Sequence, residues 1–284
     1  MMKVLICVSN LLVDEPGLVF GGKLARSLQA DISLLHVIPS KNEPKDREKG
    51  EDLLREASSI LGDPPVKTIL LWGDVVNQII KEADRGNYDM VVISVSKIGE
   101  GRQPTSSVHR SLLKNLPCCL LVVKNPKAEI KKILICTGGF QMTETLIAVS
   151  ADIASASGSE TTLFHVAANV PTMYTGLKTI EETLHELLMT DTPVARHLRR
   201  GAEILTEHNL QAELKLRHGS AVYEIVREID RVNYDLVIIG ASGANTMIKE
   251  WIFGNLAQDI VDSVGIPIMV VNQVRAANRS KFSN

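Results

Sequence analysis

Short apolar runs alternate with longer amphipathic stretches along the chain. In the amino-terminal half the apolar runs predict strands, and the stretches between them have helical periodicity. Strand–helix–strand alternation favours right-handed crossovers and a parallel sheet covered by helices on both faces. The expected strands are Lys3–Val8, Asp31–Val37, Val66–Leu71, Met90–Ile93 and Leu120–Val123, and the expected helices are Gly17–Gln29, Asp46–Leu61, Val75–Asp84 and Ser107–Asn115.

The same alternation occurs again in the carboxyl-terminal half, where several short segments recur in the same order. Matched residues are first 129 positions apart (136 − 7) and later 146 apart (235 − 89). The separation grows by 17 residues (146 − 129) between His165 and Gly219, so the second copy carries an insertion there. The matched segments are Val4–Cys7 with Ile133–Cys136, Leu34–Val37 with Leu163–Val166, Asn87–Ile93 with Asn233–Ile239, and Leu120–Val123 with Ile268–Val271.

The duplication predicts two domains of one fold class. We expect each to be an α/β domain with a doubly wound, five-stranded parallel sheet between helices, that is, an α/β/α sandwich. The expected domains are residues 1–124 and 131–273, followed by a flexible tail at 274–284. The insertion near 167–192 leaves the second strand at the edge where ligands bind, so it could be a lid or a dimer contact. The sequence favours neither.

The last strand of each copy, Leu120–Val123 and Ile268–Val271, is entirely apolar. Left unpaired, such a strand is an aggregation-prone edge. Because both copies are on one chain, the two strands can pair internally at high effective concentration. We therefore expect an intramolecular pseudo-dimer in which Val122 and Val270 lie near the contact, and further dimerisation stays open.

Composition narrows the functional class. The chain has 284 residues, of which 45% are hydrophobic but only 4% aromatic, as expected for aliphatic cores between parallel strands and helices. A formal net charge of −2 gives no basis for nucleic-acid binding. No targeting segment is visible, and no apolar run approaches the roughly 18 residues of a membrane span. The four cysteines lack metal-ligand or redox spacing, which favours structural roles and a cytoplasmic location.

Glycines gather after the fourth strand of the second copy, at the edge where an open parallel sheet binds ligands. Gly240 and Gly243 follow that strand, and Gly254 precedes the last helix. Glycines let backbone N–H groups approach an anion closely, and the start of a helix adds unpaired donors. These residues predict a phosphate-binding loop, although the same glycines could serve only to turn the chain from strand to helix.

Together with the repeated segments, this loop resembles that of the universal stress protein family. Nucleotide-binding members carry G-x-x-G, nine residues and then G-[S/T], and Gly240, Gly243 and Gly254 match the three glycines. There are two departures: ten residues separate Gly243 from Gly254, and Asn255 replaces the Ser or Thr. The resemblance covers nearly the whole chain, including the Leu-His-Val end of the second strand, the glycine after the third and the Tyr-Asp before the fourth.

The resemblance implies a site for ATP or a related adenine nucleotide, with or without Mg²⁺, in the second copy. Val166 corresponds to the residue that contacts adenine through its backbone, whereas Ser9 and Gly138 replace an Asp that commonly contacts the ribose or base. The first copy has Ser94–Lys97 in place of the glycines, so we expect it to be a degenerate partner. Family members usually dimerise by antiparallel pairing of their last strands. The candidate nucleotide-binding residues are Thr137, Gly138, Val166, Ile239, Gly240, Gly243, Gly254, Asn255, Leu256 and Ala257.

The leading hypothesis is a cytoplasmic stress-response protein that acts as a sensor or regulator by binding an adenine nucleotide and has an unidentified protein partner. The candidate loops contain no paired carboxylates, nucleophile–base pair or metal cluster, so we expect no catalytic residue. The alternative is a nucleotide-independent interaction or scaffold module with a vestigial glycine loop. An ATP pyrophosphatase-type enzyme is a weaker third hypothesis, because Ser9-Asn10 and Gly138-Gly139 replace its S-G-G-x-D-S type of loop.

The histidines are assigned to the fold. His36 and His165 end equivalent strands, and this repetition favours a structural role over catalysis. The histidines of the helical insertion have no ligand spacing, so we expect them on solvated helix faces. They are His185, His197 and His208.

Overall fold

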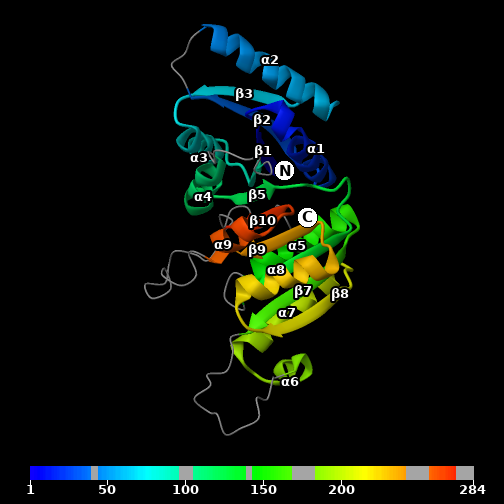
Figure 1. Ribbon diagram of the computed structural model, residues 1–284. Helices are drawn as coiled ribbons and strands as arrows, with labels where there is room; N and C mark the ends of the chain where they lie inside the picture. Colours follow the sequence, from blue (N-terminus) through cyan, green and yellow to red (C-terminus); the bar gives the residue numbers. More distant parts are fainter. Residues whose placement is uncertain (40–43, 96–104, 139–142, 168–182, 241–255, 273–284) are drawn as a thin grey trace. The chain divides into compact units, whose positions relative to one another are not determined.

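The computed structural model describes residues 1–39, 44–95, 105–138, 143–167, 183–240 and 256–272 (Figure 1). These residues form two compact units, each considered by itself below. Unit 1 consists of Met1–Glu129 and Gly265–Asn284, and unit 2 consists of Ile130–Val264. The expected flexible tail, 274–284, lies outside the described residues.

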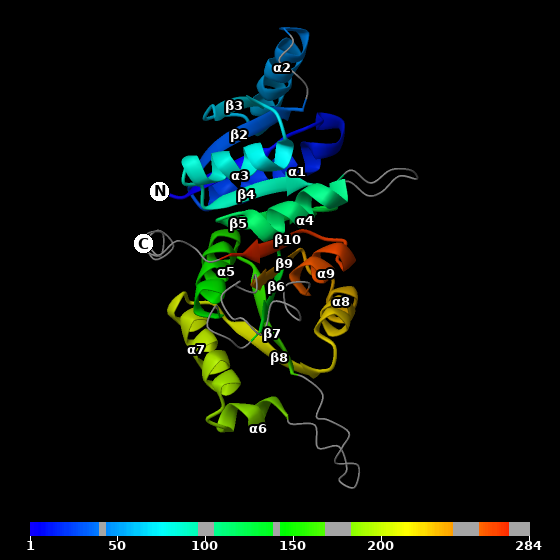
Figure 2. The ribbon, with the colours of Figure 1, turned by 90° about the vertical axis from the view of Figure 1, so that its left-hand side faces the viewer.

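The sheet of unit 1 combines five strands of the first copy with the last strand of the second. Its strands are β1 (Lys3–Cys7), β2 (Asp31–Ile38), β3 (Lys67–Trp72), β4 (Met90–Ser94), β5 (Cys119–Val123) and β10 (Ile268–Val271). Its helices are α1 (Leu11–Ser27), α2 (Pro44–Leu61), α3 (Val75–Arg85) and α4 (Thr105–Asn115). The strand order is β3-β2-β1-β4-β5-β10, and β1 to β5 are parallel, as predicted. Helices α1 and α2 cover one face, and α3 and α4 cover the other (Figures 1 and 2).

Unit 2 repeats this plan with four parallel strands among its described residues, in the order β9-β6-β7-β8. The strands are β6 (Lys132–Thr137), β7 (Glu160–Ala167), β8 (Ala212–His218) and β9 (Leu236–Gly240). The helices are α5 (Thr143–Ser157), α6 (Leu184–Met189), α7 (Pro193–Glu207), α8 (Ala221–Val232) and α9 (Leu256–Ser263). Helices α5 and α7 pack together on one face, and α8 and α9 pack together on the other (Figure 2). Both units are therefore doubly wound α/β folds.

The central strands are buried on both faces, which explains why they are aliphatic throughout. Every residue of β5 and β10 is buried. By contrast, most side chains of β3 and β8 are half-buried or exposed. These strands carry the charged residues Lys67, Lys215 and Arg217, as is usual for strands at a sheet edge.

The repeated Asn-Tyr-Asp sequence at 87–89 and 233–235 joins the fourth strand of each copy to its first. The asparagine ends the preceding helix in the left-handed conformation, with φ of 51° in unit 1 and 61° in unit 2. The tyrosine is buried, and the aspartate Oδ2 accepts backbone hydrogen bonds at the start of the first strand. The donor in unit 1 is the N–H of Lys3, at 2.8 Å, and in unit 2 the donors are those of Lys131 and Lys132, both at 2.8 Å. The repeat thus reflects a shared structural requirement.

The two matched glycines after the third strand also have one structural role. Gly73 and Gly219 adopt φ of 118° and 143°, a region that side chains strongly disfavour. In each case the glycine N–H donates to the carbonyl that ends or nearly ends the second strand, at 3.0 Å from Ile38 O and from Ala167 O. A substitution at either glycine would therefore strain the turn that leads into the next helix.

The expected antiparallel pairing of the two last strands is present in unit 1. β10 pairs antiparallel with β5, and Asn272, just beyond β10, donates from Nδ2 to Leu116 O at 3.2 Å and to Cys118 O at 2.9 Å. The pairing buries the apolar edge that β5 would otherwise expose. The register places Ile268 opposite Val122, Met269 opposite Leu121 and Val270 opposite Leu120.

The first helix begins earlier than the sequence pattern predicts. We expect its start at Gly17, but α1 begins at Leu11 because Asn10 is its N-cap and accepts a hydrogen bond from Leu12 N at 3.0 Å. The helix also ends earlier, at Ser27, since Gln29 has a positive φ of 52°. The periodicity identified the helix, whereas the cap fixes its first turn.

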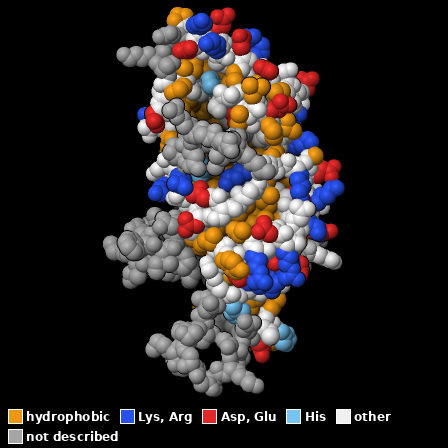
Figure 3. Space-filling model, in the orientation of Figure 1, with side chains coloured by type: hydrophobic (Ala, Val, Ile, Leu, Met, Phe, Trp, Pro, Cys, Tyr) orange, Lys and Arg blue, Asp and Glu red, His pale blue; other side chains and the backbone are white. Residues whose placement is uncertain are grey.

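Acidic and basic side chains are interspersed on the described surface that Figure 3 shows. On α2, for example, Arg47 pairs with Glu51 at 2.8 Å and Arg55 with Asp52 at 2.7 Å. Within the described ranges, no helix combines the length and the apolar character needed to cross a bilayer.

Candidate functional site

The carboxyl ends of β6 and β9 lie side by side in unit 2. Cys136 pairs with Ile239, so Thr137 and Gly240, each one residue further on, are adjacent at the same edge. From β6 the chain crosses to β7 on one side, while β9 pairs with β6 on the other. The strand order therefore reverses between β6 and β9, which is where open α/β sheets bind ligands. Exposed Gly138 continues from Thr137 at this point.

Three further candidate residues can be placed, and three fall outside the described residues. Val166 is half-buried on β7, one residue beyond the partner of Thr137. Leu256 and Ala257 form the first turn of α9 and are half-buried. Gly243, Gly254 and Asn255 belong to the segment 241–255, which the structure does not describe.

A histidine supports the end of β6. His165 on β7 is buried, and its Nδ1 lies 2.8 Å from the Thr137 carbonyl oxygen. Unit 1 has the same contact, with His36 Nδ1 at 2.8 Å from Val8 O. A carbonyl oxygen only accepts, so each imidazole carries its proton on Nδ1. Burial lowers the pKa of His165, and the nearby His218 lowers it further, against the opposing effect of the bond to Thr137.

The end of β9 at Gly240 differs from the equivalent position in unit 1. Among the described residues, a Cβ placed on Gly240 would have Leu146 Cδ2 as its neighbour, at 3.9 Å, which is an ordinary contact. The equivalent strand end in unit 1 is Ser94 (240 − 94 = 146), and a Cβ on Gly17 of α1 would overlap the Ser94 Oγ. Leu146 itself aligns with Gly17 (146 − 17 = 129). At this helix–strand contact the first copy therefore has the glycine on the helix, at Gly17, and the second copy has it at the strand end, at Gly240.

The equivalent edge of unit 1 is closed by a carboxylate that the sequence analysis missed. Asp14 of α1 is 5% exposed, and its Oδ2 accepts from Ser9 N at 2.6 Å, from Ser9 Oγ at 2.9 Å and from Asn10 N at 2.9 Å. These bonds tie the loop after β1 to the first turn of α1. Position 143, which aligns with Asp14 at the same separation of 129, is a threonine. The spacing from Asn10 to Asp14 was the available signal.

Known proteins share this arrangement over nearly the full length. The sequence profile of the universal stress protein family matches residues 1–124 and again 129–272. The chain belongs to the universal stress protein family. The two matches agree with the internal duplication, so this is a tandem universal stress protein.

One sequence relative and two solved structures show how far the similarity extends. A universal stress protein of Methanocaldococcus jannaschii is 33% identical over 86 residues, which are 29% of this chain and 51% of that protein. The chain thus matches about half the length of this relative. A universal stress protein structure from Archaeoglobus fulgidus DSM 4304 has a TM-score of 0.66 at 14% identity and covers 94% of this chain and 96% of its own. A putative universal stress protein from Pseudomonas aeruginosa UCBPP-PA14 has a TM-score of 0.69 at 17% identity, covering 100% of this chain and 98% of its own. At such identities these structures show the shared fold.

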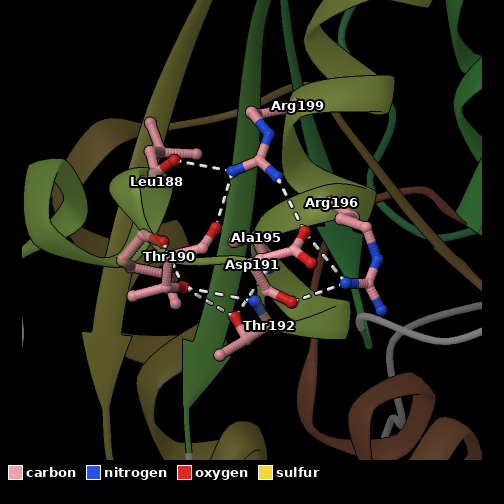
Figure 4. A network of polar contacts seen from close by, with 8 residues as sticks. Leu188, Thr190, Asp191, Thr192, Ala195, Arg196 and Arg199 are labelled. Atoms are coloured by element: carbon pink, nitrogen blue, oxygen red, sulfur yellow. Dashed lines mark hydrogen bonds and ion pairs between the residues drawn. The ribbon is translucent and has the colours of Figure 1, made fainter.

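The segment before α7 in this universal stress protein is anchored by an arginine. Arg199 on α7 donates from Nη1 to Leu188 O at 2.6 Å and to Thr190 O at 2.8 Å, and its Nη2 lies 3.8 Å from Asp191 Oδ1 (Figure 4). The carboxyl end of α6 is thereby held on α7. Of the insertion at 167–192, for which a lid and a dimer contact are the two alternatives, residues 168–182 lie outside the described part of the chain.

Other groups that could carry chemistry have structural surroundings. Burial raises the pKa of the Cys119 thiol to about 12, and burial also raises those of Cys7 and Cys136, so these thiols stay protonated and unreactive. The prediction of a solvated face is wrong for His208, which is half-buried with Nε2 at 3.4 Å from Asp152 Oδ1. In the portion that the structure describes, no three His, Cys, Asp or Glu side chains are placed to hold a metal ion.

Proposed function

We propose that this universal stress protein binds ATP or a related adenine nucleotide at the carboxyl edge of unit 2. The observation that carries the proposal is the meeting of Thr137–Gly138 with Ile239–Gly240 at the point where the strand order reverses. Gly240 presents backbone without a side chain, and no described residue crowds it. The loop sequence from Gly240 to Gly254 supports the proposal, because it matches the three glycines of the family's nucleotide-binding motif.

The available donors suit a phosphate group better than a metal ion. Backbone N–H groups at Gly138 and at the start of α9, where Leu256 and Ala257 lie, are the kind of donors that bind phosphate. The strand-end residues Thr137, Gly138, Ile239 and Gly240 bring no carboxylate. Any Mg²⁺ would therefore arrive with the phosphates of the nucleotide, which is a common way for proteins to hold it.

The proposed role is that of a sensor or regulator in a cytoplasmic stress response. The strand ends named above offer neither a nucleophile–base pair nor paired carboxylates, so we propose that the protein is not an enzyme and that any hydrolysis is slow. All four cysteines are free, and Cys118, Cys119 and Cys136 are buried, which supports a reducing compartment. The partner protein that would receive the signal is a separate question for binding experiments.

A charge placed at Gly240 tests the site directly. The Gly240→Asp variant should fold, because a Cβ there has room, and its carboxylate should repel the phosphates and weaken ATP affinity by about tenfold or more. The matched control is Gly240→Asn, which has the same size without the charge and should weaken binding much less. Isothermal titration calorimetry with ATP, ADP and AMP would give the three affinities.

The choice of probes follows proteins of the same fold. A universal stress protein in complex with cAMP and one from Archaeoglobus fulgidus in complex with dAMP have been solved, so both ligands belong in the titration. Absence of saturable binding by any of these nucleotides to the wild-type protein would end the proposal and leave the nucleotide-independent interaction module. Equal ATP affinities of the Asp and Asn variants would show that the phosphate does not bind near Gly240.

A further inference from the structure

In each unit a histidine side chain adds a hydrogen bond to the backbone ladder at the end of the first strand. In unit 2, β6 pairs with β9 as far as Cys136 and with β7 as far as Thr137. The imidazole of His165 then donates to the Thr137 carbonyl, at 2.8 Å. The same device, with His36 and Val8, ends the first strand of unit 1.

The surroundings of His165 fix the form of the donor. The side chain is 5% exposed, so the charged imidazolium would lose most of its hydration. Burial and the nearby His218 both lower the pKa of His165. The neutral ring with its proton on Nδ1 is consistent with this environment and with the Thr137 carbonyl as acceptor. Thr137 is itself buried, at 5% exposure, so its carbonyl group lies within the packed edge of the sheet.

The two units differ in what else holds the loop after the first strand. In unit 1 the Asp14 carboxylate accepts three hydrogen bonds from Ser9 and Asn10, so that loop has a second anchor beyond His36. The second copy has Thr143 at the aligned position and so lacks this carboxylate. β6 is the strand that reaches the proposed site.

We propose that His165 is a positioning residue of the nucleotide site: by holding the Thr137 carbonyl it fixes the end of β6 and, with it, the backbone of Gly138 beside Gly240. The inference rests on the proposed function. It assigns His165 a role in ligand affinity through Thr137, without any contact between the imidazole and the ligand. His36, which makes the same bond in unit 1, has no such role.

Two substitutions of His165 separate the hydrogen bond from the bulk of the ring. His165→Leu removes the donor, whereas His165→Asn places an amide nitrogen near the position of the imidazole Nδ1 and retains it. The same pair at His36 provides matched controls. Should His165→Leu fail to fold, His165→Gln takes its place, because its amide lies one bond further out and away from the carbonyl.

Hydrogen exchange and nucleotide titration are measured on the full chain for all variants. We expect amide exchange at residues 137–138 to be about tenfold faster in His165→Leu and close to wild type in His165→Asn. The ATP dissociation constant should rise about tenfold in His165→Leu and less than about threefold in His165→Asn. The His36→Leu variant should lower the melting temperature of its own unit and leave the ATP affinity unchanged.

The two readouts distinguish failure of the inference from failure of the proposed function. If His165→Leu binds ATP as tightly as wild type, or exchange at 137–138 does not change, the inference is overturned and the histidine serves stability alone. If the wild-type protein binds no nucleotide, the proposed function fails. The exchange data then decide without a ligand whether His165 fixes the end of β6.

Discussion

The buried glutamate on the helix that follows the third strand of each copy, α3 or α8, is neutralised in a different way in the two units. Glu82 in unit 1 and Glu228 in unit 2 are equivalent (228 − 82 = 146), and they are 4% and 3% exposed. In unit 1 the cation is Arg85, one turn further along the same helix, and its side chain is 74% exposed. In unit 2 the cation is Lys215 of β8, whose Nζ lies 2.8 Å from Glu228 Oε1.

This difference shows that the two copies can keep the same buried charge while the cation that pairs with it comes from a different secondary-structure element. The residue that aligns with Lys215 is Ile69 (215 − 146 = 69), which is buried in β3. In unit 2 the Tyr234 hydroxyl also donates to Glu228, at 3.2 Å. Lys215 is 16% exposed, so water would solvate Glu228 poorly if the lysine were removed. Arg85, by contrast, is already surrounded by water. The two ion pairs should therefore differ in their contribution to stability.

The largest effect is expected from removing the strand cation. Lys215→Met should lower the free energy of unfolding of unit 2 by about 3 kcal/mol, because Glu228 stays buried with a weaker set of partners. The matched variant Arg85→Met should cost less than about 1 kcal/mol in unit 1, since the Arg85 side chain is largely solvated. Denaturant-dependent hydrogen exchange of β7 and of β2 would report the two units separately.

A second substitution tests the cause. Adding Glu228→Gln to Lys215→Met removes the buried charge and should restore more than half of the lost stability. Equal losses in Lys215→Met and Arg85→Met would show that burial of the pair is irrelevant, and the comparison between the units would fail.

An intermediate effect is expected at the exchanged helix–strand contact. Gly17→Ala should destabilise unit 1 by about 1 to 3 kcal/mol, because the added Cβ overlaps the Ser94 side chain. Gly240→Ala in unit 2 should change stability by less than about 0.5 kcal/mol, because the neighbour of its Cβ among the described residues is Leu146 Cδ2 at 3.9 Å.

Thermal unfolding followed by circular dichroism would measure both changes. The double variant Gly17→Ala with Ser94→Gly should recover most of the loss. If it does not, the crowding at Gly17 comes from another part of α1.

The smallest effect is a pH dependence confined to unit 2. Burial raises the pKa of Asp152 from 3.8 to about 6, although His208 opposes the rise, and the buried Asp152 Oδ2 has no hydrogen-bond partner among the described residues. Because the folded-state pKa exceeds the unfolded one, the stabilising contribution is complete below about pH 4 and is lost as the pH rises through 6. We expect about 1 kcal/mol after solvent screening.

The aligned residue in unit 1 is Lys23 (152 − 23 = 129), so that unit should lack this dependence. Urea unfolding of wild type and of Asp152→Asn between pH 4 and 7 would isolate the contribution. If Asp152→Asn showed the same dependence of stability on pH as wild type, the dependence would belong to another group.

The fold could be predicted because its signals are local or repeated. Aliphatic runs identify strands buried on both faces, and the Asn-Tyr-Asp repeat marks equivalent places even before its hydrogen bonds are known. The pairing of β5 with β10 followed from the apolar edge that each would leave uncovered. The start of α1 was missed because its N-cap, Asn10, and the first-turn Asp14 lie outside the apolar periodicity.

The chemistry of the edges was less predictable, because it depends on contacts between elements. Glu82 and Glu228 look like ordinary polar positions of amphipathic helices, and nothing in the local sequence shows that they are buried. Lys215 on strand β8 reaches Glu228 on helix α8, and His165 reaches Thr137 across 28 residues (165 − 137). Such contacts follow from the packed structure and not from the spacing of residue types.

The place of β10 in unit 1 has a consequence for synthesis of the chain. The strand that covers β5 begins 145 residues after β5 ends (268 − 123), and Asn272 then fastens it to Leu116 and Cys118. At about 5 to 20 residues per second, a ribosome needs roughly 7 to 30 s to make the intervening polypeptide. During that interval the nascent amino-terminal copy exposes the unpaired hydrophobic edge of β5. A chaperone or a neighbouring nascent chain could bind this edge before β10 is synthesised.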